Sequence, residues 1–144
     1  ELGDFIIKRS DGLWAYNLAV VVDDGECDIT DVVRGCDLLC FTNQQIFLQE
    51  ALGLTNTTYC HLPLATHPDG CKLSKQTMAK AVTSQPAPVA LSQALAFLSH
   101  PPPNELRNAD LNTLWAWAIK NWQIKRLPQL EKQRVAPEQF FSVD

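Results

Sequence analysis

The sequence lacks several features that would each assign it to a class of protein. The apolar runs, such as residues 18–22, are far too short to span a bilayer. The first residues are acidic and do not resemble a signal peptide. The chain has no excess of basic residues either, because it contains 12 Lys and Arg and 16 Asp and Glu, for a net charge of −4. We therefore expect a cytoplasmic protein with no membrane partner, and the charge does not indicate an ordinary nucleic-acid binder.

Cysteine is present, but without the spacing of a disulfide framework or a zinc knuckle. The five cysteines are Cys27, Cys36, Cys40, Cys60 and Cys71. Their number is odd and no pair has Cys-x-x-Cys spacing, so reduced thiols are the better interpretation. Cys36 and Cys40 lie one helical turn apart, but a structural zinc site needs two further ligands that the sequence does not supply. We expect no metal site within this chain.

The chain does contain enough apolar residues for a packed core, and its charge is unevenly distributed. Hydrophobic residues make up 46% of the 144. Residues 1–71 carry three basic and eleven acidic side chains, whereas residues 72–134 carry nine basic and three acidic ones. This asymmetry indicates a polyanion facing the second half, with ordinary helix surface as the alternative.

Hydrophobic periodicity predicts an α/β chain in which strands and helices alternate. Predicted strands cover 4–9, 31–35 and 59–64, and predicted helices cover 15–24, 37–52, 89–98 and 110–122. Turn residues at 10–12 close the first strand, residues 23–25 end the first helix, and Gly53 follows the second helix. The apolar face of the last helix is typical of a core. The tail, residues 129–144, has no clear period.

Arg34 stands at the end of a predicted strand, directly before Gly35. The carboxyl ends of strands are where α/β sheets bind ligands, and a guanidinium can hold a carboxylate by two parallel hydrogen bonds. The alternative is a surface salt bridge to Asp31 or Asp37. His61, in the next strand, is more typical of a hydrogen-bonded core histidine than of a catalyst.

The sequence Lys72-Leu73-Ser74-Lys75 follows the turn Pro68-Asp69-Gly70. Two mobile ammonium groups suit phosphate oxygens and can follow the charge that develops as pyrophosphate departs. Because lysine pairs are common on solvated surfaces, a solvent-facing loop is the alternative.

Several of these segments together resemble one family. In order and spacing, the chain resembles the second half of the catalytic core of class I glutamyl-tRNA synthetases. The segments that carry this resemblance are residues 4–12, 16–24, 29–39, 61–64 and 72–75. The segment Lys72-Leu73-Ser74-Lys75, called the lysine segment below, is similar to the second signature of that class, KMSKS. The resemblance implies the second half of a Rossmann-like parallel-sheet core over residues 1–80, followed by a small helical subdomain over residues 81–144.

Within that family the chain most resembles a shortened group, the glutamyl-queuosine tRNA(Asp) synthetases. Gln76-Thr77 follows the lysine segment, fewer than seventy residues follow Gln76, and residues 118–122 resemble the closing helix of that group. The resemblance implies ATP-dependent formation of glutamyl-adenylate and transfer of glutamate to queuosine in the anticodon of tRNA(Asp). A fragment of an ordinary glutamyl-tRNA synthetase and a non-catalytic RNA-binding remnant are the alternatives.

The resemblance also implies roles for individual residues at the amino-acid site. Tyr16 and Arg34 would hold the glutamate, with Arg34 on a carboxylate. Adenylation requires that two reactants are aligned and that the developing charge is neutralised. It does not require a protein nucleophile. The implied partners are glutamate, ATP and queuosine-bearing tRNA(Asp), and we expect a monomer.

For the nucleotide, the resemblance implies that Lys72, Ser74 and Lys75 act on the ATP phosphates and that Leu62 borders the ATP. Mg²⁺ would accompany the ATP. The histidine signature that opens the core of this class, and the cysteine cluster that binds zinc in relatives, are absent from these 144 residues. We therefore expect a fragment or half of a larger fold, with an incomplete sheet and half of an ATP site.

Overall fold

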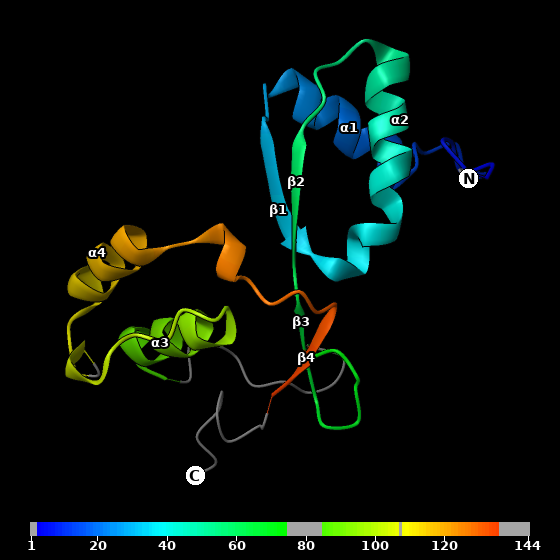
Figure 1. Cartoon of the computed structure of the whole chain (residues 1–144). Helices are drawn as coiled ribbons and strands as arrows, with labels where there is room; N and C mark the ends of the chain where they lie inside the picture. The colour runs from blue at the N-terminus through cyan, green and yellow to red at the C-terminus, as the bar shows by residue number, and fades with distance from the viewer. Residues whose placement is uncertain (1–2, 75–84, 107, 136–144) are drawn as a thin grey trace. The chain divides into compact units, whose positions relative to one another are not determined.

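The computed structural model describes residues 3–74, 85–106 and 108–135 (Figure 1). The chain divides into two compact units, a first unit of Glu1–His61 and a second unit of Leu62–Asp144. The domain boundary that we expect at residue 80 falls within 75–84, outside the described residues, and it stays a prediction.

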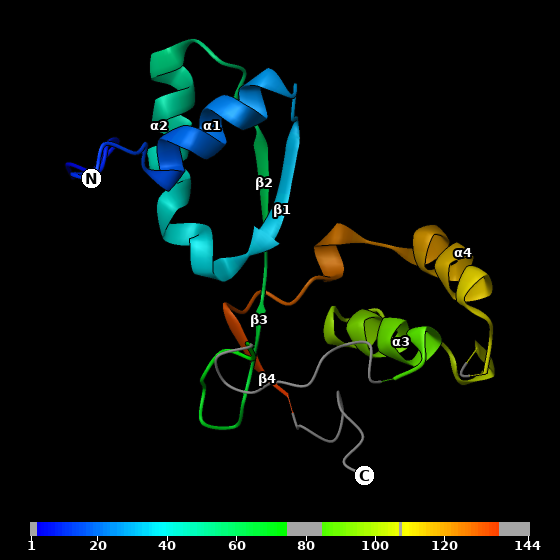
Figure 2. The same ribbon diagram turned by 180° about the vertical axis from the view of Figure 1, so that it is seen from behind.

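The first unit is built from two strands and the helices beside them. In chain order its elements are α1 (Tyr16–Glu26), β1 (Asp31–Gly35), the 3₁₀ helix η1 (Cys36–Phe41), α2 (Thr42–Leu52) and β2 (Thr58–Leu62). β1 and β2 pair side by side and run in the same direction (Figures 1 and 2), and the Thr58 N–H donates to the Thr30 carbonyl at 2.8 Å where they begin. α1 and α2 pack against each other, burying Val21 and Leu48.

The predicted helix at 15–24 is confirmed, but its predicted end at residues 23–25 is wrong. α1 continues to Glu26. Gly25 lies inside the helix and faces Leu54, where an added Cβ would lie 2.9 Å from a Leu54 methyl carbon. A larger residue at this position would therefore require the Leu54 side chain to shift.

The predicted strand at 4–9 is also wrong. Only an isolated antiparallel bridge between Lys8 and Trp14 forms there, closed by a turn in which Gly12 has φ = 88°. The turn itself confirms the interpretation of residues 10–12. Ile6 is 71% exposed, so this segment lacks the neighbouring strand that would bury its apolar side chains.

The predicted helix at 37–52 is two elements. η1 precedes α2, which begins at Thr42, and Gly53 ends α2 in the left-handed conformation (φ = 67°), as expected. The Leu38 carbonyl in η1 accepts a hydrogen bond from the Arg34 side chain. Part of this turn therefore binds the arginine and is not part of a continuous α-helix.

The second unit contains a small parallel sheet and a pair of helices. Its elements are β3 (Leu64–Thr66), α3 (Ala87–Phe97), η4 (Asn104–Leu106), α4 (Leu111–Asn121), η5 (Ile124–Arg126) and β4 (Lys132–Arg134). β3 pairs with β4 from Leu64↔Lys132 to Thr66↔Arg134. The predicted strand at 59–64 is corrected here, because Pro63, which has no N–H to donate, separates β2 from β3. β4 lies in the tail that had no period.

α3 and α4 confirm the two helices predicted after residue 86. Asp110 caps α4 by accepting hydrogen bonds from the backbone N–H groups of Asn112 and Thr113. Leu114 is fully buried, whereas Ile119 on the same predicted core face is 75% exposed. The prediction that this whole face is core is therefore only partly right.

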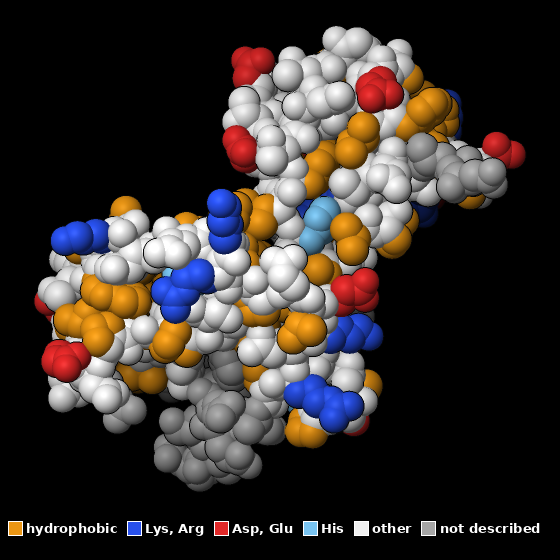
Figure 3. Space-filling model, in the orientation of Figure 1, with side chains coloured by type: hydrophobic (Ala, Val, Ile, Leu, Met, Phe, Trp, Pro, Cys, Tyr) orange, Lys and Arg blue, Asp and Glu red, His pale blue; other side chains and the backbone are white. Residues whose placement is uncertain are grey.

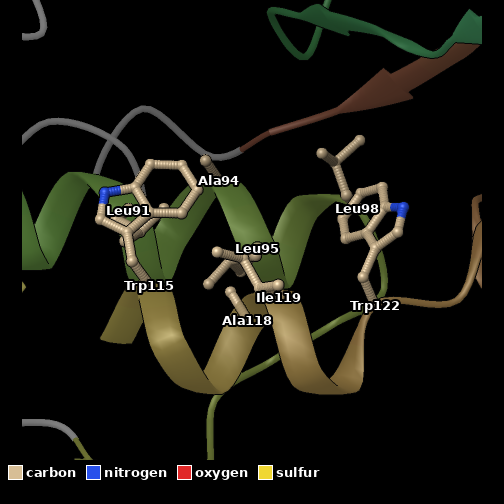
Figure 4. Close-up of a pocket in the computed structure, with 8 residues that line it drawn as sticks. All are labelled: Leu91, Ala94, Leu95, Leu98, Trp115, Ala118, Ile119 and Trp122. Carbon is tan, nitrogen blue, oxygen red and sulfur yellow. The ribbon is translucent and has the colours of Figure 1, made fainter. Parts of the chain in front are cut away.

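A hollow of about 280 Å³ lies between α3 and α4, with Trp115 and Trp122 at its two ends (Figure 4). Its lining is apolar: Leu91, Ala94, Leu95, Leu98, Trp115, Ala118, Ile119 and Trp122. Without polar groups to orient a charged substrate, this hollow does not suit glutamate or ATP.

The α/β prediction is confirmed, with parallel strand pairs and helices in both units. The first unit has three basic and ten acidic residues, and the second has nine basic and six acidic. Figure 3 shows lysine and arginine side chains spread over the visible face of the second unit. In the described part of the chain, no helix is both long enough and apolar enough to cross a membrane.

Candidate functional site

Arg34 occupies the end of β1, where its partly buried guanidinium is held by four hydrogen bonds. Nε donates to Nε2 of His61 at 3.2 Å, and Nη1 donates to Oε1 of Gln45 at 2.6 Å. Nη2 donates to Oγ1 of Thr42 at 2.9 Å and to the Leu38 carbonyl at 3.3 Å. The β1 end, η1, the start of α2 and β2 together fix the position of this side chain.

Every one of these acceptors is neutral. Among the residues that the structure describes, the recorded ion pair joins Arg9 to Asp11, and no carboxylate pairs with Arg34. The alternative of a salt bridge to Asp31 or Asp37 is therefore wrong. A partly buried charge without a counter-ion is unfavourable unless something else compensates for it, so the arrangement suits an anionic ligand.

Tyr59 supports the guanidinium from β2. The centre of the guanidinium lies 4.8 Å from the Tyr59 ring centre, within the range of cation–π attraction. The Tyr59 hydroxyl accepts a hydrogen bond from Nε2 of Gln49 at 3.1 Å, which anchors the ring to α2. A stacked ring favours the cation without neutralising it.

The His61 ring is uncharged in this cluster. Its Nε2 accepts from Arg34 and also lies 3.1 Å from Oγ1 of Thr42, so the proton of the ring sits on Nδ1. Burial, and then the Arg34 charge, lower the pKa of His61 from its ordinary value of 6.5. The expectation of a hydrogen-bonded histidine agrees with these contacts, and the absence of a catalytic role stays a prediction.

Tyr16, the other predicted glutamate-binding residue, begins α1 and is 54% exposed. Its neighbour Asn17 is buried and accepts a hydrogen bond from Nε2 of Gln45 at 3.1 Å. The position beside Tyr16 is thus joined through Gln45 to Arg34, all within the first unit. The role of Tyr16 on a ligand stays a prediction.

The predicted phosphate-binding segment follows a tight hairpin in the second unit. Oδ1 of Asp69 accepts a hydrogen bond from the Cys71 N–H at 2.8 Å, a contact that also lowers the pKa of Asp69, and Gly70 has φ = 87°. The hairpin pairs Lys72 with Thr66, and the Leu73 N–H donates to the Ala65 carbonyl at 2.9 Å. The segment is therefore anchored to β3 at its first two residues.

Lys72 is exposed and Ser74 partly buried, whereas Lys75 lies outside the described residues. Leu62, the predicted neighbour of ATP, is partly buried at the end of β2. The glutamate set belongs to the first unit and the ATP set to the second.

Sequence reasoning assigned no role to Gln45, Thr42 or Tyr59, which contact Arg34. One signal was present, because polar residues 42–45 interrupt an otherwise apolar helix. Within residues 3–74, 85–106 and 108–135, no group of three or more His, Cys, Asp or Glu side chains could hold a metal ion.

Comparison with protein families places these elements in one of them. Residues 1–106 match the family described as tRNA synthetases class I (E and Q), catalytic domain. Among solved structures, the glutamate-tRNA synthetase from Elizabethkingia anophelis resembles the chain with a TM-score of 0.67 and 24% identity, over 96% of this chain and 31% of that one. At this identity the likeness supports the fold alone.

Curated relatives are more similar in sequence. The chain is 49% identical to the glutamyl-Q tRNA(Asp) synthetase of Chromobacterium violaceum over 89% of its length, and 53% identical to that of Thiobacillus denitrificans over 89%. It spans 42% of the length of each of these relatives. The family match over most of the chain, together with the parallel strands, shows that the chain belongs to the class I tRNA synthetases of the E and Q type, as part of their catalytic domain.

Proposed function

We propose that the intact protein activates glutamate with ATP, forming glutamyl-adenylate and pyrophosphate, and transfers the glutamate to queuosine in the anticodon of tRNA(Asp). This chain would supply the part of the site that holds the glutamate and part of the site that holds the ATP phosphates. The names of the curated relatives support the choice of this reaction.

The observation that carries the proposal is the Arg34 cluster. Its guanidinium has five N–H donors, of which four bond to neutral protein groups and one, on Nη1, has no acceptor among the described residues. A ligand carboxylate would meet that donor and an uncancelled positive charge. This arrangement fits the carboxylate that glutamate brings to adenylation.

The nucleotide half of the proposal rests on Lys72, Ser74 and Lys75, with Leu62 beside the ATP. Two ammonium groups and a hydroxyl would stabilise the charge that develops on the departing pyrophosphate. ATP is the co-substrate that class I synthetases use, and Mg²⁺ would accompany it. The chemistry needs no protein nucleophile, because the glutamate carboxylate itself attacks the α-phosphate.

The test is glutamate-dependent exchange of pyrophosphate into ATP by the intact protein, with and without tRNA. Arg34→Ala should reduce kcat/KM for glutamate about 10- to 150-fold, since one hydrogen bond to a charged group contributes about 1.5–3 kcal/mol. Arg9→Ala is the matched control, because Arg9 is exposed and pairs with Asp11. Equal activity of the two variants would show that Arg34 does not bind glutamate. Absence of exchange by the unmodified protein would favour a non-catalytic RNA-binding remnant.

A fragment of an ordinary glutamyl-tRNA synthetase is the second candidate, because solved glutamate-tRNA synthetases share the fold. The chemistry at Arg34 would be the same in both, so pyrophosphate exchange does not separate them. The identity of the tRNA that accepts the glutamate does.

A further inference from the structure

Gln45 lies at the centre of the Arg34 cluster, although nothing in the family resemblance assigned it a role. It is 1% exposed, in the first turns of α2, and its Oε1 forms the shortest of the four bonds to the guanidinium, at 2.6 Å. Its Nε2 donates to Oδ1 of Asn17 at 3.1 Å. Both ends of a fully buried amide are therefore engaged.

The direction of this chain of amides follows from the arginine. A guanidinium can only donate, so the Gln45 atom that faces it must be the carbonyl oxygen. The Gln45 NH₂ then points at Asn17, which must present its own oxygen there. The Asn17 NH₂ is left to donate to Oε1 of Gln44, at 2.7 Å. One orientation of Arg34 thus fixes three amide side chains on two helices.

The chemical type of Gln45 matters as much as its position. A carboxylate at this buried site would also accept from Arg34, but it would form an ion pair and cancel the charge. The amide oxygen accepts the same hydrogen bond and leaves the net positive charge in place. His61, Thr42 and the Leu38 carbonyl share this property, but Gln45 is the side chain that a single-atom change converts into an acid.

We propose that Gln45 is a positioning residue for substrate binding, whose buried neutral amide holds the Arg34 guanidinium in place without cancelling its charge. This inference rests on the proposed activation of glutamate. In this proposal, the Gln45–Asn17 hydrogen bond also connects Arg34, at the end of β1, to the start of α1 beside Tyr16.

The decisive variant is Gln45→Glu, studied in the intact protein. The three amides can accommodate it by reversing, so that Asn17 donates to the new carboxylate and Gln44 donates to Asn17. Thermal unfolding should therefore change little. The KM for glutamate should rise at least about tenfold, because the guanidinium would already have an anionic partner, while the KM for ATP stays within about twofold of the unmodified protein.

Asn43→Asp is the matched control. Asn43 is exposed on the same turn of α2, so this change adds the same charge to the same helix end without contacting Arg34. Its KM for glutamate should stay within about twofold. If Gln45→Glu and Asn43→Asp raise this KM equally, or if neither changes it, the proposal for Gln45 is wrong.

A second variant covers the case in which Gln45→Glu does not fold. Gln45→Met keeps the length of the side chain but removes the acceptor, so Arg34 keeps its charge and loses its fixed position. We expect a smaller rise in the KM for glutamate than Gln45→Glu gives, again with little change for ATP. An unchanged KM in Gln45→Met would contradict the positioning role. Absence of glutamate-dependent exchange in the unmodified protein would instead overturn the proposed function, which separates the two failures.

Discussion

At the scale of single residues, the first unit holds a positive charge by hydrogen bonds rather than by counter-ions. Arg34 donates to an imidazole, an amide, a hydroxyl and a backbone carbonyl, and it stacks on Tyr59. Such a set fixes the direction of the guanidinium while leaving it attractive to an anion. The physical cost is a partly buried charge, and buried charges of this kind concentrate at functional sites.

The neutral state of His61 makes the cluster sensitive to pH. Because burial and Arg34 lower its pKa in the folded state, the unfolded chain takes up the proton first as the pH falls through 6.5. The stabilisation is therefore complete above that pH and is lost progressively on acidification towards the lowered pKa. Protonation would also place a cation against Arg34.

We expect the free energy of unfolding to fall between pH 7.5 and about 5, and His61→Gln to reduce this slope, since glutamine still offers an oxygen to Arg34. Urea unfolding across that pH range measures both. A slope that is identical in the two proteins would show that His61 does not contribute in this way.

Lys75 belongs to the residue scale as well, although it lies outside the described residues. If its ammonium acts mainly on the departing pyrophosphate, Lys75→Ala should lower kcat for adenylation more than it raises the KM for ATP. Pyrophosphate exchange at varied ATP gives both constants, and Lys120→Ala is the control because the Lys120 side chain in α4 is exposed. Equal losses in binding and rate would indicate simple ATP binding.

Arg34 could be predicted from the sequence, but its partners could not. An arginine beside glycine at the end of a strand indicates a ligand site. The segment Lys72-Leu73-Ser74-Lys75 indicates contact with phosphates for a different reason, because it places two ammonium groups directly after a turn. Tyr59 carries no such local signal, and Thr42 and Gln45 carry only the weak one that polar residues 42–45 interrupt an apolar helix. They contact Arg34 only because β2 returns beside β1 and brings its residues to the same place, which is a property of the fold.

At the scale of elements, the helices were predicted well because their apolar spacing is local. The errors lie where tertiary contacts decide. Residues 4–9 have the composition of a strand but no neighbouring strand, and Pro63 divides one expected strand into β2 and β3. β4 was missed because Lys132–Arg134 forms a strand only through its pairing with β3.

The pairing of α3 with α4 depends on few buried side chains, and Leu114 is the most buried of them. Leu114→Ala should lower the free energy of unfolding of the second unit by about 2–5 kcal/mol, since it removes buried methyl groups and leaves a cavity. Ile119→Ala on the same helix is the matched control and should cost less than about 0.5 kcal/mol, because Ile119 is largely exposed. Chemical denaturation followed by tryptophan fluorescence compares them, and equal losses would contradict the observed packing.

At the scale of the whole molecule, two compact units carry different chemistry. The first is acidic overall and holds Arg34, whereas the second has a basic excess and holds the lysine segment. Basic charge in the second unit accords with the partners proposed for it, ATP phosphates and an RNA backbone. The chain spans less than half the length of the curated relatives it matches, so its activity must be tested in the intact protein.

The most direct measurement is the transfer of radiolabelled glutamate by the intact protein, in the presence of ATP, to three purified RNAs. These are tRNA(Asp) that bears queuosine, tRNA(Asp) that lacks it, and tRNA(Glu). We predict label on the queuosine-bearing tRNA(Asp) alone, and loss of that label in Arg34→Ala. Label on tRNA(Glu) with none on tRNA(Asp) would contradict the proposed function and identify an ordinary glutamyl-tRNA synthetase instead.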